Sequence, residues 1–153
     1  SAWSRLDMNA HRQFAYAALL SLYCVSALSA RADEAAATHT DYMLRCQGCH
    51  LPDGSGYPGK VPDLRLTMPR LLASEEGRAF LLQVPGASLS ILDDARLARV
   101  LNWMVVAFVP GGAPPGFKPF TAEEVGPLRR QPLADVQAVR GPIAAALGLP
   151  EHY

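Results

Sequence analysis

Residues 46–50 hold two cysteines separated by two residues and followed at once by a histidine, and this run constrains the chain more than any other feature. Two thiols at this spacing can form thioether bonds with the two vinyl groups of a haem, and the adjacent imidazole can then ligate the iron. The sequence therefore predicts one covalent haem c, attached at Cys46 and Cys49, with His50 as the proximal iron ligand. The fold has to build a pocket for this flat cofactor beside the motif.

Two other uses of a Cys-x-x-Cys pair are zinc binding and thiol–disulfide exchange. Zinc would need a second pair of ligands, but the only other cysteine, Cys24, lies in a segment that we expect to be removed. Thiol–disulfide exchange is typical of a motif placed between a strand and a helix, and the chain downstream lacks the alternating pattern of strands. Both alternatives stay open, but the context favours haem.

An export signal precedes the motif. Arg12 is followed by a largely apolar run, residues 14–28, and then by the small residues around Ala30 and Ala32. This arrangement is typical of a secretory signal peptide, and the run is short for a membrane span. We expect a periplasmic protein without a membrane span in its mature chain, the alternative being an uncleaved N-terminal anchor. Residues 1–7 precede Met8, which resembles a natural start.

Composition and the positions of Pro and Gly predict three segments in the chain. Residues 1–32 hold the upstream residues and the signal peptide, 33–108 form one domain, and 109–153 form a linker rich in Pro and Gly with a short helical tail. Lys and Arg total 14, as do Asp and Glu, so the formal net charge is zero and nothing indicates a nucleic-acid partner.

The domain is expected to be all-α. We expect Thr40 and Asp41 to cap a first short helix, Ser74 to begin a second helix that ends near Gln83, and Asp93 to begin a third that ends at Phe108. The third helix carries an apolar stripe at helical spacing, formed by Leu97, Val100, Leu101, Met104, Val105 and Phe108.

The loop after the motif and the tail also contain features that predict local structure. The glycines of the loop 51–62 suit turns that approach a flat cofactor closely. In the tail, Thr121 and Glu124 form a capping-box pattern, whereas Pro127 and Pro142 are expected to interrupt the helix. The apolar residues of the tail can pack on the domain or on a partner.

These features together resemble a monohaem class I c-type cytochrome. The match covers residues 38–108 and rests on the attachment motif after a helix, a Gly-rich loop, the run Pro62-Asp63-Leu64 and a late amphipathic helix with Trp103. The resemblance implies a small all-α fold around one haem, and one-electron transfer between partner proteins rather than enzyme activity. It also implies that the carbonyl of Pro62 accepts a hydrogen bond from His50.

The sixth iron ligand is where the sequence departs from this family, which usually places a methionine shortly before the last helix. Residues 84–94 contain none. Met68, which precedes a proline, is the candidate that we name. The alternatives are Met104 in the apolar stripe, the imidazoles of His39 and His152, and an open or unrecognised sixth position.

This choice separates two functions. A closed iron serves an electron carrier, whereas an open one would bind a small gas or a peroxide. Catalysis would need a distal acid–base group, and no distal His–Arg pair is evident. Lys60, Arg65 and Arg70 are expected near the haem crevice, where they could meet the haem propionates or an acidic partner. The long tail raises the further hypothesis that the protein is the cytochrome subunit of a periplasmic dehydrogenase.

Overall fold

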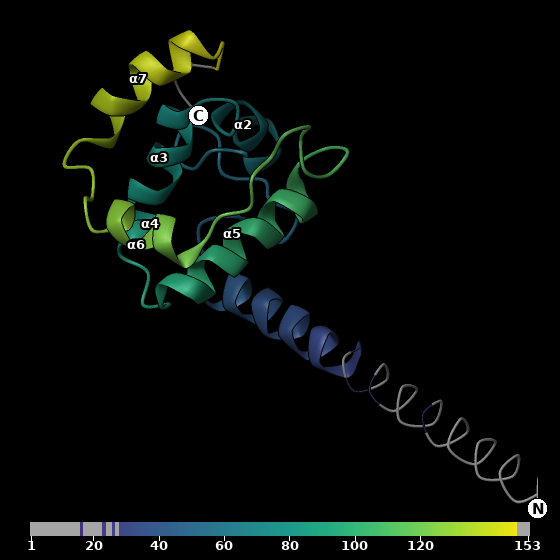
Figure 1. Cartoon of the computed structure of the whole chain (residues 1–153). Coiled ribbons are helices and arrows are strands. Elements are labelled where there is room, and N and C mark those ends of the chain that lie inside the picture. Colours follow the sequence, from purple (N-terminus) through teal and green to yellow (C-terminus); the bar gives the residue numbers. More distant parts are fainter. Residues whose placement is uncertain (1–15, 17–22, 24–25, 27, 150–153) are drawn as a thin grey trace, which may run out of the picture. The chain divides into compact units, whose positions relative to one another are not determined.

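The computed structural model describes Tyr16, Tyr23, Ser26 and residues 28–149 (Figure 1). The chain divides into two compact units, Ser1–Ala37 and Thr38–Tyr153. Most of the predicted signal segment lies outside the described residues, as do Cys24 and His152, and residues 28–37 of the first unit are helical. No helix in the described part is long and apolar enough to cross a bilayer.

The second unit is all-α, as predicted, and the residues described for it contain only one isolated β-bridge, between Tyr57 and Val61. Residues 38–45 are helical, and six labelled helices follow. Their bounds are α2 Leu64–Leu71, α3 Glu75–Gln83, α4 Pro85–Ser88, α5 Asp94–Phe108, α6 Ala122–Arg129 and α7 Val136–Ala146.

The capping predictions for α3 and α5 are confirmed. The Ser74 hydroxyl accepts a hydrogen bond from the Gly77 amide, and the Asp93 carboxylate accepts one from the Arg96 amide. All six residues of the predicted stripe on α5 are buried. This face meets α2 and α6, so α5 lies at the centre of the larger of the two hydrophobic clusters in the described chain.

The prediction that Thr40 and Asp41 cap a helix is wrong, because the residues before them are already helical. Asp41 is instead buried and pairs with Arg96 of α5, whose Nη2 lies 2.5 Å from Oδ1 of Asp41. Next to it, Tyr42 is fully buried and packs against the rings of Trp103 and Phe108. This helix therefore packs on α5 through one ion pair and an aromatic cluster.

Helix α2 was not predicted, and two tail helices run through prolines that were expected to stop them. Pro69, Pro127 and Pro142 lie inside α2, α6 and α7 respectively. A proline leaves the carbonyl four residues earlier without its helical donor. For Pro142 that carbonyl belongs to Ala138, which is exposed, so water can satisfy it.

The tail packs on the domain, which is one of the two arrangements considered above. Residues 109–121 lead from α5 to α6, and α7 lies against α3 (Figure 1). Asn102 fixes the end of this linker, because its amide donates to the Phe120 carbonyl at 2.9 Å and accepts from the Phe120 amide at 2.7 Å. Arg78 of α3 pairs with Glu124 and lies 3.8 Å above the Phe120 ring.

The tail also completes a second hydrophobic cluster. Its buried members are Leu71, Phe80, Ala144 and Leu149, so α2 and α3 contribute one half and the tail the other. The capping box at Thr121 is half formed: its hydroxyl accepts from the Glu124 amide at 3.3 Å, while the Glu124 carboxylate pairs with Arg78 instead of the helix start.

Candidate haem site

The attachment motif forms a tight turn directly after the helical residues 38–45. The Cys46 amide donates to the Tyr42 carbonyl at 2.8 Å, and the His50 amide donates to the Cys46 carbonyl at 2.9 Å. The Tyr42 hydroxyl donates to the Leu51 carbonyl at 2.7 Å and so fixes the chain beyond the motif. These bonds hold the two thiols and the imidazole on one wall of a cavity.

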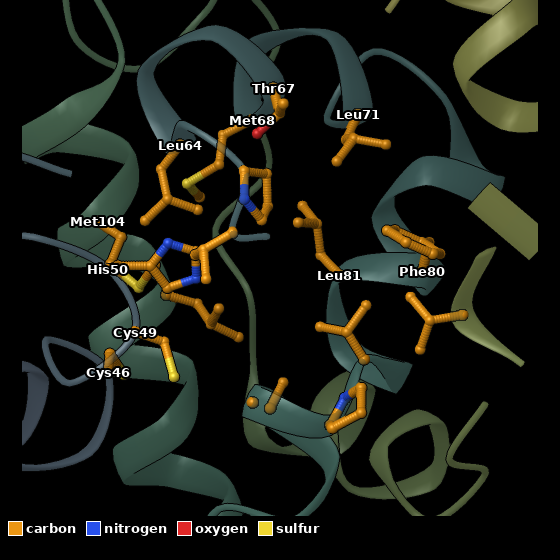
Figure 2. Close-up of a pocket in the computed structure, with 18 of the residues that line it drawn as sticks. Cys46, Cys49, His50, Leu64, Thr67, Met68, Leu71, Phe80, Leu81 and Met104 are labelled. Atoms are coloured by element: carbon orange, nitrogen blue, oxygen red, sulfur yellow. The ribbon is translucent and has the colours of Figure 1, made fainter. Parts of the chain in front are cut away.

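This cavity has a volume of about 410 Å³ and is enclosed mainly by apolar side chains. Figure 2 shows His50 beside Cys46 and Cys49, with Met104, Leu64 and Met68 on the same flank and with Leu81 and Phe80 across the space. Helices α2, α3, α4 and α5 all contribute to its walls, and α7 of the tail contributes Val136, Gln137, Arg140 and Ala144.

The environment of His50 suits a buried iron ligand. Burial lowers the pKa of the imidazole, and the nearby Pro62 carbonyl opposes this shift by raising the pKa. The Nδ1 atom is buried and makes no hydrogen bond of ordinary distance and angle within the described chain. The Pro62 carbonyl thus lies close to His50 without completing a bond to it, and its predicted role as an acceptor stays a prediction.

The state of Cys46 argues against thiol–disulfide exchange. Burial, the negative charge of Asp41 and the neighbouring Cys49 raise the pKa of its thiol to about 11. A redox-active cysteine needs a lowered pKa, because the thiolate is the nucleophile. In the described part of the chain, no group of three or more His, Cys, Asp or Glu side chains is placed to hold a metal ion.

The chemistry of the cavity wall fits haem. Three cations line the cavity, namely Arg45, Lys60 and Arg140, and no Asp or Glu is among its lining residues in the part described. Haem combines a flat apolar ring with two carboxylates, so it matches apolar walls that carry positive charge only. Arg140 is only 4% exposed, so its charge acts through a medium of low dielectric constant.

Of the three cations expected near the crevice, Lys60 lines the cavity, whereas Arg65 and Arg70 are not among the described residues that line it. Arg65 instead pairs with Asp53 and Asp63, and Arg70 donates a hydrogen bond to the Gly148 carbonyl. Arg45 and Arg140 were missed. The signal for Arg140 was its place at helical spacing within the apolar residues of the tail, four residues after Val136.

The Gly-rich loop also has a different role from the predicted one, because residues 53–59 do not line the cavity. Gly54 has a φ of 77°, and a Cβ there would lie 2.5 Å from the Phe108 ring. A Cβ at Gly56 would clash with the carbonyl oxygens of Val61 and Pro62. These glycines permit close packing within the protein rather than close approach to the cofactor.

The candidates for the sixth ligand differ in their access to the cavity. Met68 is fully buried on α2 and Met104 is buried on α5, and both line the cavity. His39 is exposed and packs on Trp103, with 5.1 Å between the ring centroids, and it does not line the cavity. Coordination by Met68 stays a prediction.

An all-α unit with a Cys-x-x-Cys-His turn on the wall of an apolar, positively charged cavity is the architecture of a c-type cytochrome domain. Cytochrome c-552 of Thermus thermophilus is 35% identical to this chain over 113 residues, which cover 62% of this chain and 86% of the relative. A second cytochrome c-552, from a particular strain of the same species, shows the same identity, and the match covers 76% of its length. No protein-family model matches the chain.

The chain therefore belongs to the class I c-type cytochromes, the electron carriers that hold haem c and its iron.

Proposed function

We propose that the protein is a periplasmic electron carrier with a single haem c, bound through thioethers at Cys46 and Cys49 and ligated by His50. The observation that carries this proposal is the hydrogen-bonded turn that holds all three side chains on one wall of the cavity. When bound, the haem supplies an iron that accepts and releases one electron.

The residues around the motif would orient the proximal ligand, neutralise the haem carboxylates and exclude water. The Pro62 carbonyl would accept from Nδ1 of His50, which would orient the ring and raise its basicity as a ligand. Arg45, Lys60 and Arg140 would neutralise the haem carboxylates. Leu81 and the other apolar side chains exclude water, and a low dielectric around the iron helps to set the reduction potential.

Electrons need a route to the surface, and the attachment turn provides one. Cys49 is exposed, while Cys46 is partly buried, so the thioether edge of the cofactor would lie close to solvent. A partner protein that docks over this edge would exchange electrons without any change in the fold. We propose that this partner is a redox protein, with a periplasmic dehydrogenase as the donor.

The test is maturation of the full chain in a bacterial host that attaches haem c in the periplasm. Cell fractionation, intact mass and the pyridine haemochrome spectrum should show an exported protein with one covalent haem, and potentiometry should show a reversible one-electron couple. Cys49→Ser should lose one thioether, whereas the control Ser55→Ala, outside the motif, should lose neither. A protein that matures without covalent haem would refute the proposal, and co-purification with a dehydrogenase would identify the donor.

A further inference from the structure

The part of α3 and α4 that faces the attachment motif carries, among the described residues that line the cavity, no side chain capable of ligating iron. In Figure 2, Phe80 and Leu81 of α3 lie across the cavity from His50, together with Leu71 at the end of α2. Residues 84–87, at the end of α3 and in α4, are Val, Pro, Gly and Ala and complete this lining. Residues 84–93 separate α3 from α5, and four of these are taken up by α4, so little chain is left to arch over the cavity. This wall offers carbon and hydrogen where a sixth ligand would need nitrogen, oxygen or sulfur.

The two methionines that line the cavity lie on the other flank. Figure 2 shows the side chain of Met68 next to Leu64, and that of Met104 next to His50. Both methionines belong to the main hydrophobic cluster, together with Leu64 and Leu101. The proximal and sixth ligands of a haem iron bind on opposite faces of the ring. A methionine sulfur on the flank of His50 would have to leave the core and cross the cavity to reach the other face, at the cost of its packing.

The polar groups of the cavity do not equip it for acid–base chemistry. The Thr67 hydroxyl donates to the Asp63 carbonyl at 2.8 Å, and Gln137 is exposed on α7. His50 is the one imidazole, and no carboxylate is present, among the described residues that line the cavity. Cleavage of a peroxide needs a group that moves a proton near the iron. Arg45, Lys60 and Arg140 also line the cavity, but they are assigned above to the haem carboxylates. The apolar wall of Phe80 and Leu81 therefore offers an anionic ligand no counter-charge of its own, and burying a charge there is costly.

We propose that no side chain of the described residues of this domain closes the sixth position of the iron, and that this position takes a neutral diatomic ligand of the class of carbon monoxide and nitric oxide. Such ligands need neither a proton donor nor a counter-charge, and they match the apolar wall of Phe80, Leu81 and α4. This inference rests on the proposed haem site and adds a ligand-binding function to it.

The experiment is titration of the reduced, haem-loaded full chain with carbon monoxide, followed by absorption and resonance Raman spectroscopy. We expect a high-spin ferrous spectrum that converts completely to a carbon monoxide adduct. Met68→Leu and Met104→Leu should leave the spin state unchanged. Leu81→His should place an imidazole on the facing wall, convert the ferrous protein to low spin and weaken carbon monoxide binding at least about tenfold, or roughly 1.4 kcal/mol. The matched control is Leu89→His, because Leu89 is exposed and does not line the cavity.

The opposite results would overturn the inference. A low-spin ferrous spectrum that carbon monoxide leaves unchanged, and that becomes high-spin in Met68→Leu or Met104→Leu, would show that a methionine closes the iron. The electron-carrier proposal would survive that outcome, because haem attachment and the one-electron couple would remain. A chain without covalent haem would remove both proposals together.

Discussion

The two walls of the cavity differ in composition and in how far apart their residues lie in the chain. The attachment wall centres on Cys46, Cys49 and His50, which lie within a run of five residues that hydrogen bonds hold to the helical turn before it. The facing wall combines the end of α2 with α3, α4 and the tail, so its residues come from positions 71–149. The chemistry of the site is thus local in sequence, whereas its shape and its exclusion of water depend on tertiary packing.

The largest effect is expected from a substitution in the attachment wall. His50→Ala should abolish the native spectrum of the matured protein, because the iron loses its proximal ligand while both thioethers remain. Mass spectrometry should still show covalent haem, which separates lost ligation from lost attachment. His39→Ala is the control, since His39 is exposed and does not line the cavity. A native spectrum in His50→Ala would refute the ligand assignment.

The next largest effect concerns the stability of the tail that completes the facing wall, tested at a residue that does not line the cavity. Asn102→Ala removes both hydrogen bonds to the Phe120 backbone and leaves that amide and carbonyl without this side-chain partner. The free energy of unfolding should fall by about 1–3 kcal/mol, measured by urea denaturation of the loaded protein. Gln131→Ala, at an exposed position of the same tail, should change it by less than about 0.5 kcal/mol. Equal effects would show that the linker does not depend on Asn102.

These differences also explain which parts of the molecule were predictable. The attachment motif, the caps at Ser74 and Asp93 and the stripe on α5 are local signals, and the structure has each of them. Helix α2 was missed because Met68 was considered only as an iron ligand, although the buried residues Leu64, Met68 and Leu71 stand at helical spacing. Asp41 was interpreted as a cap because its partner, Arg96, lies 55 residues away.

The facing wall was not predictable for the same physical reason. Arg140 reaches the cavity only because the linker returns the tail to α3, and no local pattern specifies that return. Gly54 is likewise required because a Cβ there would clash with the Phe108 ring, which belongs to a helix distant in the sequence. Features that a few neighbouring residues determine are therefore predictable from the sequence, whereas features that depend on long-range packing are not.

A smaller effect tests the charge that the tail contributes to the cavity. Arg140→Leu removes a buried positive charge and should lower the reduction potential, because a nearby positive charge disfavours the ferric state, which carries one positive charge more than the ferrous state. A change of about 1 kcal/mol corresponds to roughly 40 mV for one electron. Potentiometry should show this shift, with Arg140→Lys staying closer to the parent protein. An unchanged potential in Arg140→Leu would place this charge outside the influence of the iron.

The smallest effect concerns the start of α2, which follows Pro62 on the attachment side. The Asp63 carboxylate accepts from the Arg65 amide at 2.9 Å and pairs with the Arg65 guanidinium at 2.6 Å, and these contacts lower its pKa. A carboxyl with a lowered folded pKa stabilises the protein above its unfolded pKa, and that contribution disappears as the pH falls through the folded pKa.

Asp63→Asn keeps an N-cap side chain but removes the charge, so it should cost up to about 1 kcal/mol at pH 7 and progressively less below about pH 4. Urea denaturation of both proteins across this range measures the difference. Asp135→Asn is the matched comparison, because Asp135 caps α7 by accepting from the Ala138 amide and so reports the effect of the same substitution at a second cap. A cost at Asp63 that does not change with pH would assign the stabilisation to the hydrogen bond at the cap, and not to the charge shared with Arg65.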